Sequence, residues 1–129
     1  MSQENVEIVR KLFESQGSDF YELLDPDVVW LNYASAPEPG PYLGHEGVHE
    51  WAKGWRATFG DFEIHPTEII DAGGDQVVVV GRVAGAGTMS GAPVDREMAW
   101  LFTLLSRRIV RGQGFETRGE ALEAAGLRE

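Results

Sequence analysis

Residues 44–51 read GHEGVHEW, and within them His45-Glu46-Gly47-Val48-His49 matches the pattern H-E-x-x-H. On a helix, this spacing places two histidines one turn apart on the same face, with a glutamate beside them. Zinc metalloproteases use such an arrangement to hold the metal and to supply a general base. The first question is therefore whether this chain is a small zinc enzyme.

The residues that follow the motif favour a structural role for it. Val48, Trp51 and Trp55 recur at helical spacing and predict a helix over about 45–59 whose buried face they form. The two histidines flank that face, and they supply only two ligands where a catalytic zinc needs three. The helix N-terminus also disfavours a cation, because its free N–H groups carry partial positive charge. We therefore predict no metal at this motif.

The bulk properties of the sequence are those of an acidic globular protein. The chain has 129 residues, a net charge of −10 and no cysteine. This length predicts one domain over residues 1–129, and the acidic balance argues against nucleic acid or an anionic membrane as a partner. The polar N-terminus and the absence of cysteine fit a cytoplasmic location. No glycine-rich loop opens a helix as a phosphate-binding loop does, and we predict no cofactor.

The periodicity of the apolar residues predicts helix, helix, strand, helix, then four strands and a short final helix. Most of the strands are joined by turns, so we expect an α+β fold in which a curved antiparallel sheet wraps around three helices from the N-terminal half. The predicted helices are 2–15, 19–25, 45–59 and 117–129, and the predicted strands are 28–34, 61–72, 76–87, 94–105 and 108–116.

The order and spacing of several phrases resemble the SnoaL-like branch of the nuclear transport factor 2-like superfamily. These phrases are MSQENVEIVRKLFES, LLDPDVVW, GPYLGHEGVHEW, DAGGDQVVVVGRV and GEALEAAGL, and together they span nearly the whole chain. The resemblance implies a cone-shaped domain whose bent sheet closes over an apolar pocket. It also implies that relatives often carry arginine where this chain has His45 and His49, which agrees with our prediction of no metal there. The superfamily includes steroid isomerases, epoxide hydrolases, polyketide cyclases and proteins without known activity.

The resemblance locates the catalytic groups of relatives, and this chain differs at most of them. Where the steroid isomerases carry a tyrosine and two acids, this sequence has Leu12, Asn32 and Trp100, so that mechanism is not expected. Arg82 lacks the partner acid of the epoxide hydrolases, and Glu116 is available where the cyclases use an acid. The catalytic candidates are Asn32 and Arg82 as donors to a developing oxyanion, and Glu116 as acid or base.

Strand alternation predicts which side chains face the pocket. Arg82 either reaches the rim or pairs internally with Glu116 or Asp95, and the two glycines of the last strand are expected to leave room. The ligand expected is a small apolar organic molecule, bound either for catalysis or by a non-catalytic binding module. The predicted pocket residues are Trp30, Trp51, Trp55, Val80, Met98, Trp100, Phe102, Gly112 and Gly114.

The same alternation suggests a homodimer through the outer face of the sheet. Phe115, Leu101, Val79 and Val83 are expected to point away from the pocket and to form an apolar surface. Soluble monomers rarely expose a large apolar patch, and two-fold association is the commonest way to cover one. We therefore expect a second copy of the chain as a partner.

Overall fold

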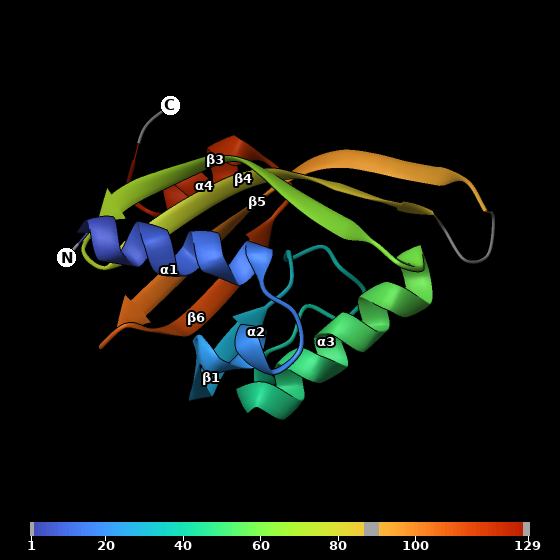
Figure 1. The fold of residues 1–129 in the computed structure, drawn as a ribbon. Helices are drawn as coiled ribbons and strands as arrows, with labels where there is room; N and C mark the ends of the chain where they lie inside the picture. Colours follow the sequence, from blue (N-terminus) through green and yellow to red (C-terminus); the bar gives the residue numbers. More distant parts are fainter. Residues whose placement is uncertain (1, 87–90, 128–129) are drawn as a thin grey trace.

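The computed structural model describes residues 2–86 and 91–127, which form one mixed sheet and the helices that pack on it (Figure 1). None of the helices in these residues is both long and apolar enough to cross a membrane. The helices are α1 (Ser2–Glu14), α2 (Ser18–Glu22), α3 (Gly44–Phe59) and α4 (Arg118–Ala124). The strands are β1 (Leu24–Leu31), β2 (Tyr42–Leu43), β3 (Glu63–Gly73), β4 (Gln76–Ala86), β5 (Pro93–Leu105) and β6 (Arg108–Phe115).

The strands lie in the order β2-β1-β6-β5-β4-β3. All neighbours are antiparallel except β1 and β6, which are parallel. The predicted α+β class is confirmed, with this one parallel pair as an addition. The pair is possible because α3 and four strands lie between β1 and β6 in the chain, which is long enough for a parallel crossover.

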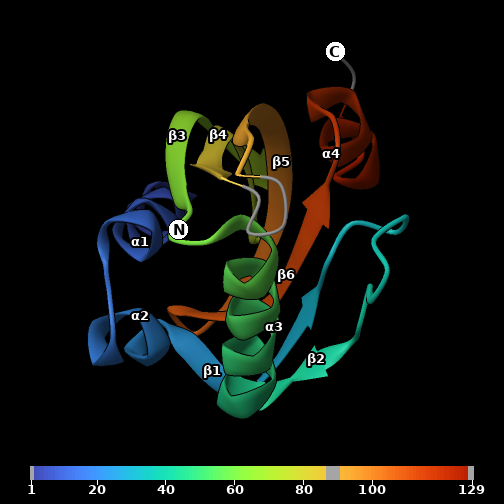
Figure 2. The ribbon, with the colours of Figure 1, turned by 90° about the vertical axis from the view of Figure 1, so that its right-hand side faces the viewer.

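The sheet curves around the helices of the N-terminal half. Figure 2 shows α3 inside the curve, with the strands passing from β3 round to β2, and α4 on the opposite side of the sheet. We call the side that holds α1, α2 and α3 the concave face and the side that holds α4 the convex face. The concave face therefore contains the space in which a cavity can form.

Local sequence signals account for most of the element boundaries. Ser106 and Arg107 adopt φ values of 51° and 68°, which suits the tight turn predicted between β5 and β6. β1 begins at Leu24 and so includes a proline that we expected to lie before it; the register of β1 against β6 is irregular there, between Leu24 and Val29. The two-residue strand β2 was not predicted, because so short a segment carries no periodicity.

Both faces of β4 are buried, and this reverses one of our predictions. Val77, Val79 and Val83 pack into the concave core, whereas Val78 and Val80 pack with α4 on the convex face. The four consecutive valines are each at most 2% exposed. A strand buried on both faces reads as a continuous apolar run, so its sequence does not reveal which side chains point inward. Val80 therefore faces away from the concave side, contrary to the prediction.

The face predicted to form a homodimer is largely covered within the chain. Val79 and Val83 lie in the concave core, and Leu101 and Phe115 pack in the convex cluster that contains two residues of α4. The reason given for a dimer is therefore wrong for this surface. Association with a second copy stays a prediction that needs another surface.

We predict opposite effects on stability for alanine at Gly47 and at Gly54, both on α3. A Cβ at Gly47 would lie 2.6 Å from the backbone carbonyl carbon of Tyr42, so α3 and β2 would have to separate, at a cost of about 1–3 kcal/mol. A Cβ at Gly54 would meet no atom within 4 Å, and alanine there should raise the free energy of unfolding by about 0.5–1 kcal/mol through helix propensity. Denaturant unfolding measures both, and a stabilising Gly47→Ala would contradict the close contact.

Candidate functional site

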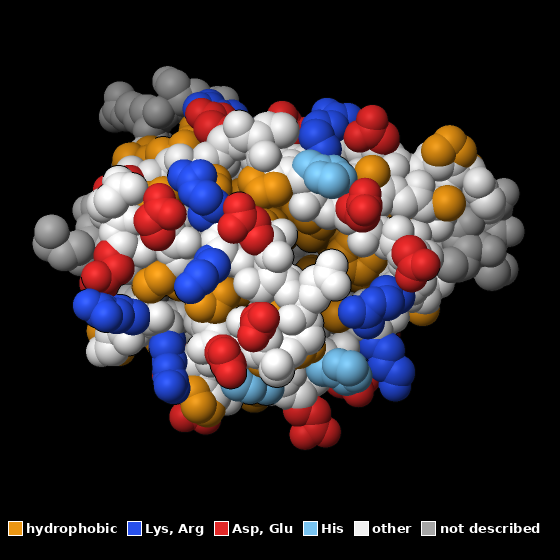
Figure 3. Space-filling model, viewed as in Figure 1, with side chains coloured by type: hydrophobic (Ala, Val, Ile, Leu, Met, Phe, Trp, Pro, Cys, Tyr) orange, Lys and Arg blue, Asp and Glu red, His pale blue; other side chains and the backbone are white. Residues whose placement is uncertain are grey.

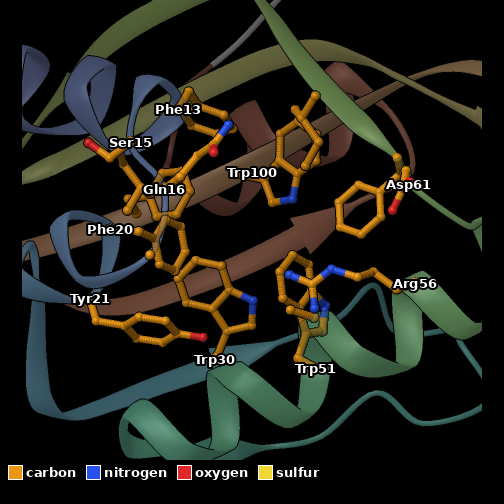
Figure 4. Close-up of a pocket in the computed structure, with 16 residues that line it drawn as sticks. Phe13, Ser15, Gln16, Phe20, Tyr21, Trp30, Trp51, Arg56, Asp61 and Trp100 are labelled. Atoms are coloured by element: carbon orange, nitrogen blue, oxygen red, sulfur yellow. The ribbon is translucent and has the colours of Figure 1, made fainter.

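A cavity of about 550 Å³ opens on the concave face between α1, α2, α3 and the sheet (Figure 4). Figure 3 shows the surface hollowed near its centre, with apolar side chains inside the hollow and charged ones around it. Much of the wall is aromatic, and we call this space the aromatic cavity. Its lining residues are Leu12, Phe13, Ser15, Gln16, Gly17, Phe20, Tyr21, Trp30, Trp51, Ala52, Arg56, Asp61, Phe62, Ile64, Trp100 and Phe102.

Contacts between aromatic rings hold the wall together across four elements. The ring centroid of Trp30 on β1 lies 5.3 Å from that of Trp51 on α3 and 5.8 Å from that of Phe102 on β5. Phe13 on α1 lies 5.8 Å from Trp100 and 5.9 Å from Phe102. These spacings are typical of edge-to-face and tilted aromatic pairs, which add to the free energy of burial. The wall is thus a continuous ring network rather than a set of independent side chains.

Gly112 provides the room in which two of these rings lie. It is paired with Trp30 on β1 and with Phe102 on β5. A Cβ at Gly112 would lie 2.9 Å from two ring atoms of Trp30 and 3.2 Å from the ring of Phe102. The space that we predicted for a ligand at this glycine is therefore filled by the rings themselves. At Gly114 the nearest atom to a Cβ would be 3.5 Å away.

Four of the nine predicted pocket residues line the cavity: Trp30, Trp51, Trp100 and Phe102. The other five lie elsewhere: Trp55 and Met98 are buried in the concave core, Val80 is on the convex face, and Gly112 and Gly114 lie beneath the tryptophan rings. Trp55 stands behind the wall, with its ring 5.2 Å from Trp51.

The three catalytic candidates are not brought together in the cavity. Asn32 follows the end of β1, where its side-chain oxygen accepts a hydrogen bond from the backbone N–H of Tyr33. Arg82 lies on the surface, and its guanidinium is 3.0 Å from the carboxylate of Asp95. None of the three candidates lines the cavity. The structure therefore does not support the oxyanion arrangement that we assigned to these residues.

Glu116, the third candidate, belongs to a small polar cluster beyond the end of β6. The hydroxyl of Ser35 donates a hydrogen bond of 2.6 Å to Glu116. The other carboxylate oxygen is 3.4 Å from the guanidinium of Arg96, and both of these side chains are at least 40% exposed. Arg96 also lies over the ring of Tyr33, 5.7 Å from its centroid. This cluster ties the loop after β1 to the sheet.

The polar groups that do line the cavity were not predicted. Ser15 and Gln16 lie in the turn between α1 and α2, Tyr21 lies on α2, Arg56 lies on α3 and Asp61 lies in the turn after α3. Each lies next to a helix end or beside the buried stripe of α3, so strand alternation could not identify them. The helix-breaking glycines Gly17 and Gly60, with φ values of 60° and 66°, were the available signal for the two turns.

Two lining residues, Tyr21 and Trp51, carry hydrogen-bond donors whose surroundings bear on ligand binding. Burial raises the pKa of the Tyr21 phenol above its usual value, and the charge of Arg56 opposes part of that rise. The hydroxyl therefore stays protonated at neutral pH and is available as a donor. The indole nitrogen of Trp51, a residue that is 7% exposed, is buried without a hydrogen-bond partner. A buried donor left unpaired costs free energy, so this N–H is an unfilled position for an acceptor.

The H-E-x-x-H motif lies on the first turns of α3 and is used for packing. His45 Nε2 is 2.9 Å from the backbone carbonyl of Leu24, and its ring is 5.5 Å from that of Tyr21. Because a carbonyl oxygen can only accept, this nitrogen must carry a proton and is not free to bind zinc. His49 is exposed, one turn further along. Within the described residues, no group of three His, Cys, Asp or Glu side chains could hold a metal ion.

The comparisons with known proteins agree with this architecture. The SnoaL-like domain family matches residues 10–112, so the chain belongs to that family. A solved NTF2-like protein from Burkholderia thailandensis E264 has a TM-score of 0.78 at 19% identity, covering 95% of this chain and 96% of that one. A protein from Jannaschia sp. CCS1, named after the SnoaL-like polyketide cyclases, has a TM-score of 0.76 at 25% identity over 95% and 91%.

A third similar structure is that of TerC, co-crystallised with polyporic acid. It has a TM-score of 0.76 at 20% identity and covers 95% of this chain and 98% of TerC. The comparison with curated proteins gave no match. At these identities the solved structures establish the NTF2-like fold, and the chemistry must be argued from the residues of this chain.

We predict that Gly112→Ala destabilises the protein by about 1–3 kcal/mol, because the added methyl group must displace the buried rings of Trp30 and Phe102. Gly114→Ala is the matched control on the same strand, and its effect should stay within about 0.5 kcal/mol. Denaturant unfolding followed by tryptophan fluorescence measures both. Equal stability of the two variants would contradict the packing of the rings over Gly112.

We predict that alanine substitutions of the two histidines lower the free energy of unfolding by different amounts and that neither histidine binds zinc. His45→Ala should lower the free energy of unfolding by about 1–2 kcal/mol, because the Leu24 carbonyl loses its donor. His49→Ala, on the exposed side, should change it by less than about 0.5 kcal/mol. Metal analysis of protein purified without a histidine tag completes the test. Stoichiometric zinc, lost in both variants, would restore the metalloenzyme hypothesis.

Proposed function

We propose that this protein binds a small, flat, largely apolar organic molecule in the aromatic cavity. The observation that supports this most directly is the open space of about 550 Å³, half of whose lining residues are aromatic and which also has polar side chains in its wall. Ligand pockets have this volume and this balance of apolar walls and polar anchors. TerC, which shares the fold, was co-crystallised with an organic compound, polyporic acid. Binding is favoured over catalysis because the catalytic candidates of the strands lie outside the cavity.

A proton-transfer enzyme of the isomerase, cyclase or hydrolase kind is the second candidate. It is favoured by Asp61 and Tyr21, which line the same cavity. In such a reaction Asp61 would remove a proton, and the Tyr21 hydroxyl would donate to the oxygen on which charge develops. Polycyclic ketones and epoxides should be screened for turnover. Turnover that is lost in Asp61→Asn would support the enzyme, and bound but unchanged compounds would contradict it.

The binding proposal is tested by filling the cavity. Ala52→Phe places a ring where the half-buried Ala52 lines the wall. We expect the affinity for a neutral aromatic probe, 2-naphthamide, to fall at least about tenfold, as judged by isothermal titration calorimetry. Lys53→Phe adds the same ring to the exposed side of α3 and should leave the affinity unchanged. Far-UV circular dichroism checks that both variants fold.

Two results of these titrations would contradict the binding proposal. If the unmodified protein binds no aromatic probe, or if Ala52→Phe binds as tightly as the unmodified protein, the aromatic cavity is not a ligand site. If Lys53→Phe weakens binding as much as Ala52→Phe does, the site lies on the outer side of α3 instead.

A further inference from the structure

We infer that the ligand of the aromatic cavity carries an anionic oxygen group, such as a carboxylate or an enolate, which binds to Arg56. This inference depends on the proposed binding function and adds the chemical class of the ligand. The aromatic rings would hold the apolar body of the molecule. The oxygen group would lie at the side of the cavity formed by α3, where Figure 4 shows the Arg56 side chain extending from that helix.

The first observation behind the inference is that Arg56 has no carboxylate partner among the described residues. Asp61 lines the same cavity, yet the two side chains form no ion pair. Most other arginines of the described residues do have one: the paired ones are Arg10, Arg82, Arg96, Arg107 and Arg118. In a chain of net charge −10, a cation that lines a cavity and forms no ion pair with a carboxylate is available to an anionic ligand.

The second observation is independent of charge. Trp51 lines the cavity wall, and its indole N–H is buried and has no acceptor. An indole nitrogen can only donate, so only a ligand atom with a lone pair satisfies it. Because the nitrogen is covered when the cavity is empty, the ligand must displace a neighbouring side chain to reach it. The Tyr21 hydroxyl is protonated at neutral pH and is a further donor on a residue of the same wall.

A cationic ligand is the opposite hypothesis, and the residues disfavour it. Aromatic faces attract quaternary ammonium groups, and Asp61 would add a negative charge. Against this, Arg56 would repel a cation in the same space, and a cation offers no acceptor to Trp51 or Tyr21. The lining residues therefore supply three donors, from Arg56, Tyr21 and the covered Trp51 N–H, and one carboxylate, from Asp61, while Gln16 can donate or accept. Because donors outnumber carboxylates among the lining residues, the cavity favours a ligand with an anionic oxygen group.

The test uses three probes with the same ring system and different charge. They are 2-naphthoate, neutral 2-naphthamide and the cation (2-naphthylmethyl)trimethylammonium. We expect 2-naphthoate, which is ionised at pH 7, to bind about tenfold more tightly than the amide and more tightly than the cation, because its contact with arginine is charge-assisted. Isothermal titration calorimetry at two salt concentrations gives the affinities, and the preference should weaken with salt.

Substitutions on α3 assign the preference to its residues. Arg56→Gln should abolish the difference between naphthoate and naphthamide, whereas Lys53→Gln, the same change of charge on the exposed side, should preserve it. Trp51→Phe keeps a ring and removes the N–H, and it should weaken naphthoate and naphthamide alike by about fivefold to tenfold. Thermal unfolding of each variant separates loss of binding from loss of folding.

The possible results distinguish the two proposals. Tightest binding of the cation, or a naphthoate preference unchanged in Arg56→Gln, would overturn the inference while leaving the binding function in place. Failure of all three probes to bind would reject the binding function and the inference with it.

Discussion

The packing of Trp30 and Phe102 over Gly112 is the contact on which the rest of this structure depends. Gly112 pairs with both residues, one on each neighbouring strand. Only a residue without a side chain allows both rings to lie over the strand, at a centroid distance of 5.8 Å. Through this contact the parallel strand β1 is held against β6. Trp30 then reaches Trp51 and so positions α3 inside the curved sheet.

The same packing decides the character of the cavity. The rings of Trp30, Trp51, Trp100 and Phe102, together with Phe13 of α1, form much of the wall around the open space. The charged residues that line this space, Arg56 and Asp61, lie in the last turn of α3 and just after that helix. The arginine–carboxylate pairs of the described residues lie outside the cavity on exposed surface, where each contributes little to stability. Arg56 and Asp61 are also exposed, but they are the charged side chains that line the cavity, so they bear most directly on which ligand it accepts.

Membership of the SnoaL-like family defines the fold of this chain and leaves its chemistry to individual residues. The positions at which related enzymes carry catalytic acids are occupied here by residues that pack in the cavity wall or form hydrogen bonds outside the cavity. Trp100 packs in the wall, Asn32 stabilises the loop after β1, and Glu116 binds Ser35 and Arg96. The donors that remain in the cavity, from Trp51, Tyr21 and Arg56, suit recognition of a ligand oxygen. The chain thus has a cavity within the fold, while the residues at the positions of the related enzymes' catalytic acids have structural roles.

The sequence by itself determined the α+β class, most of the elements, the buried stripe of α3 and the inward-facing residues Trp30, Met98, Trp100 and Phe102. These follow from local periodicity, which is set by the geometry of a single helix or strand. The site residues could be predicted only in part. A run of four valines does not say which face of β4 meets α4, and Gly112 does not say whether a ligand or a tryptophan fills its space. The tertiary structure decided both, and it brought Tyr21, Arg56 and Asp61 to one cavity, because contacts between elements far apart in the chain leave no periodic signal within any one of them.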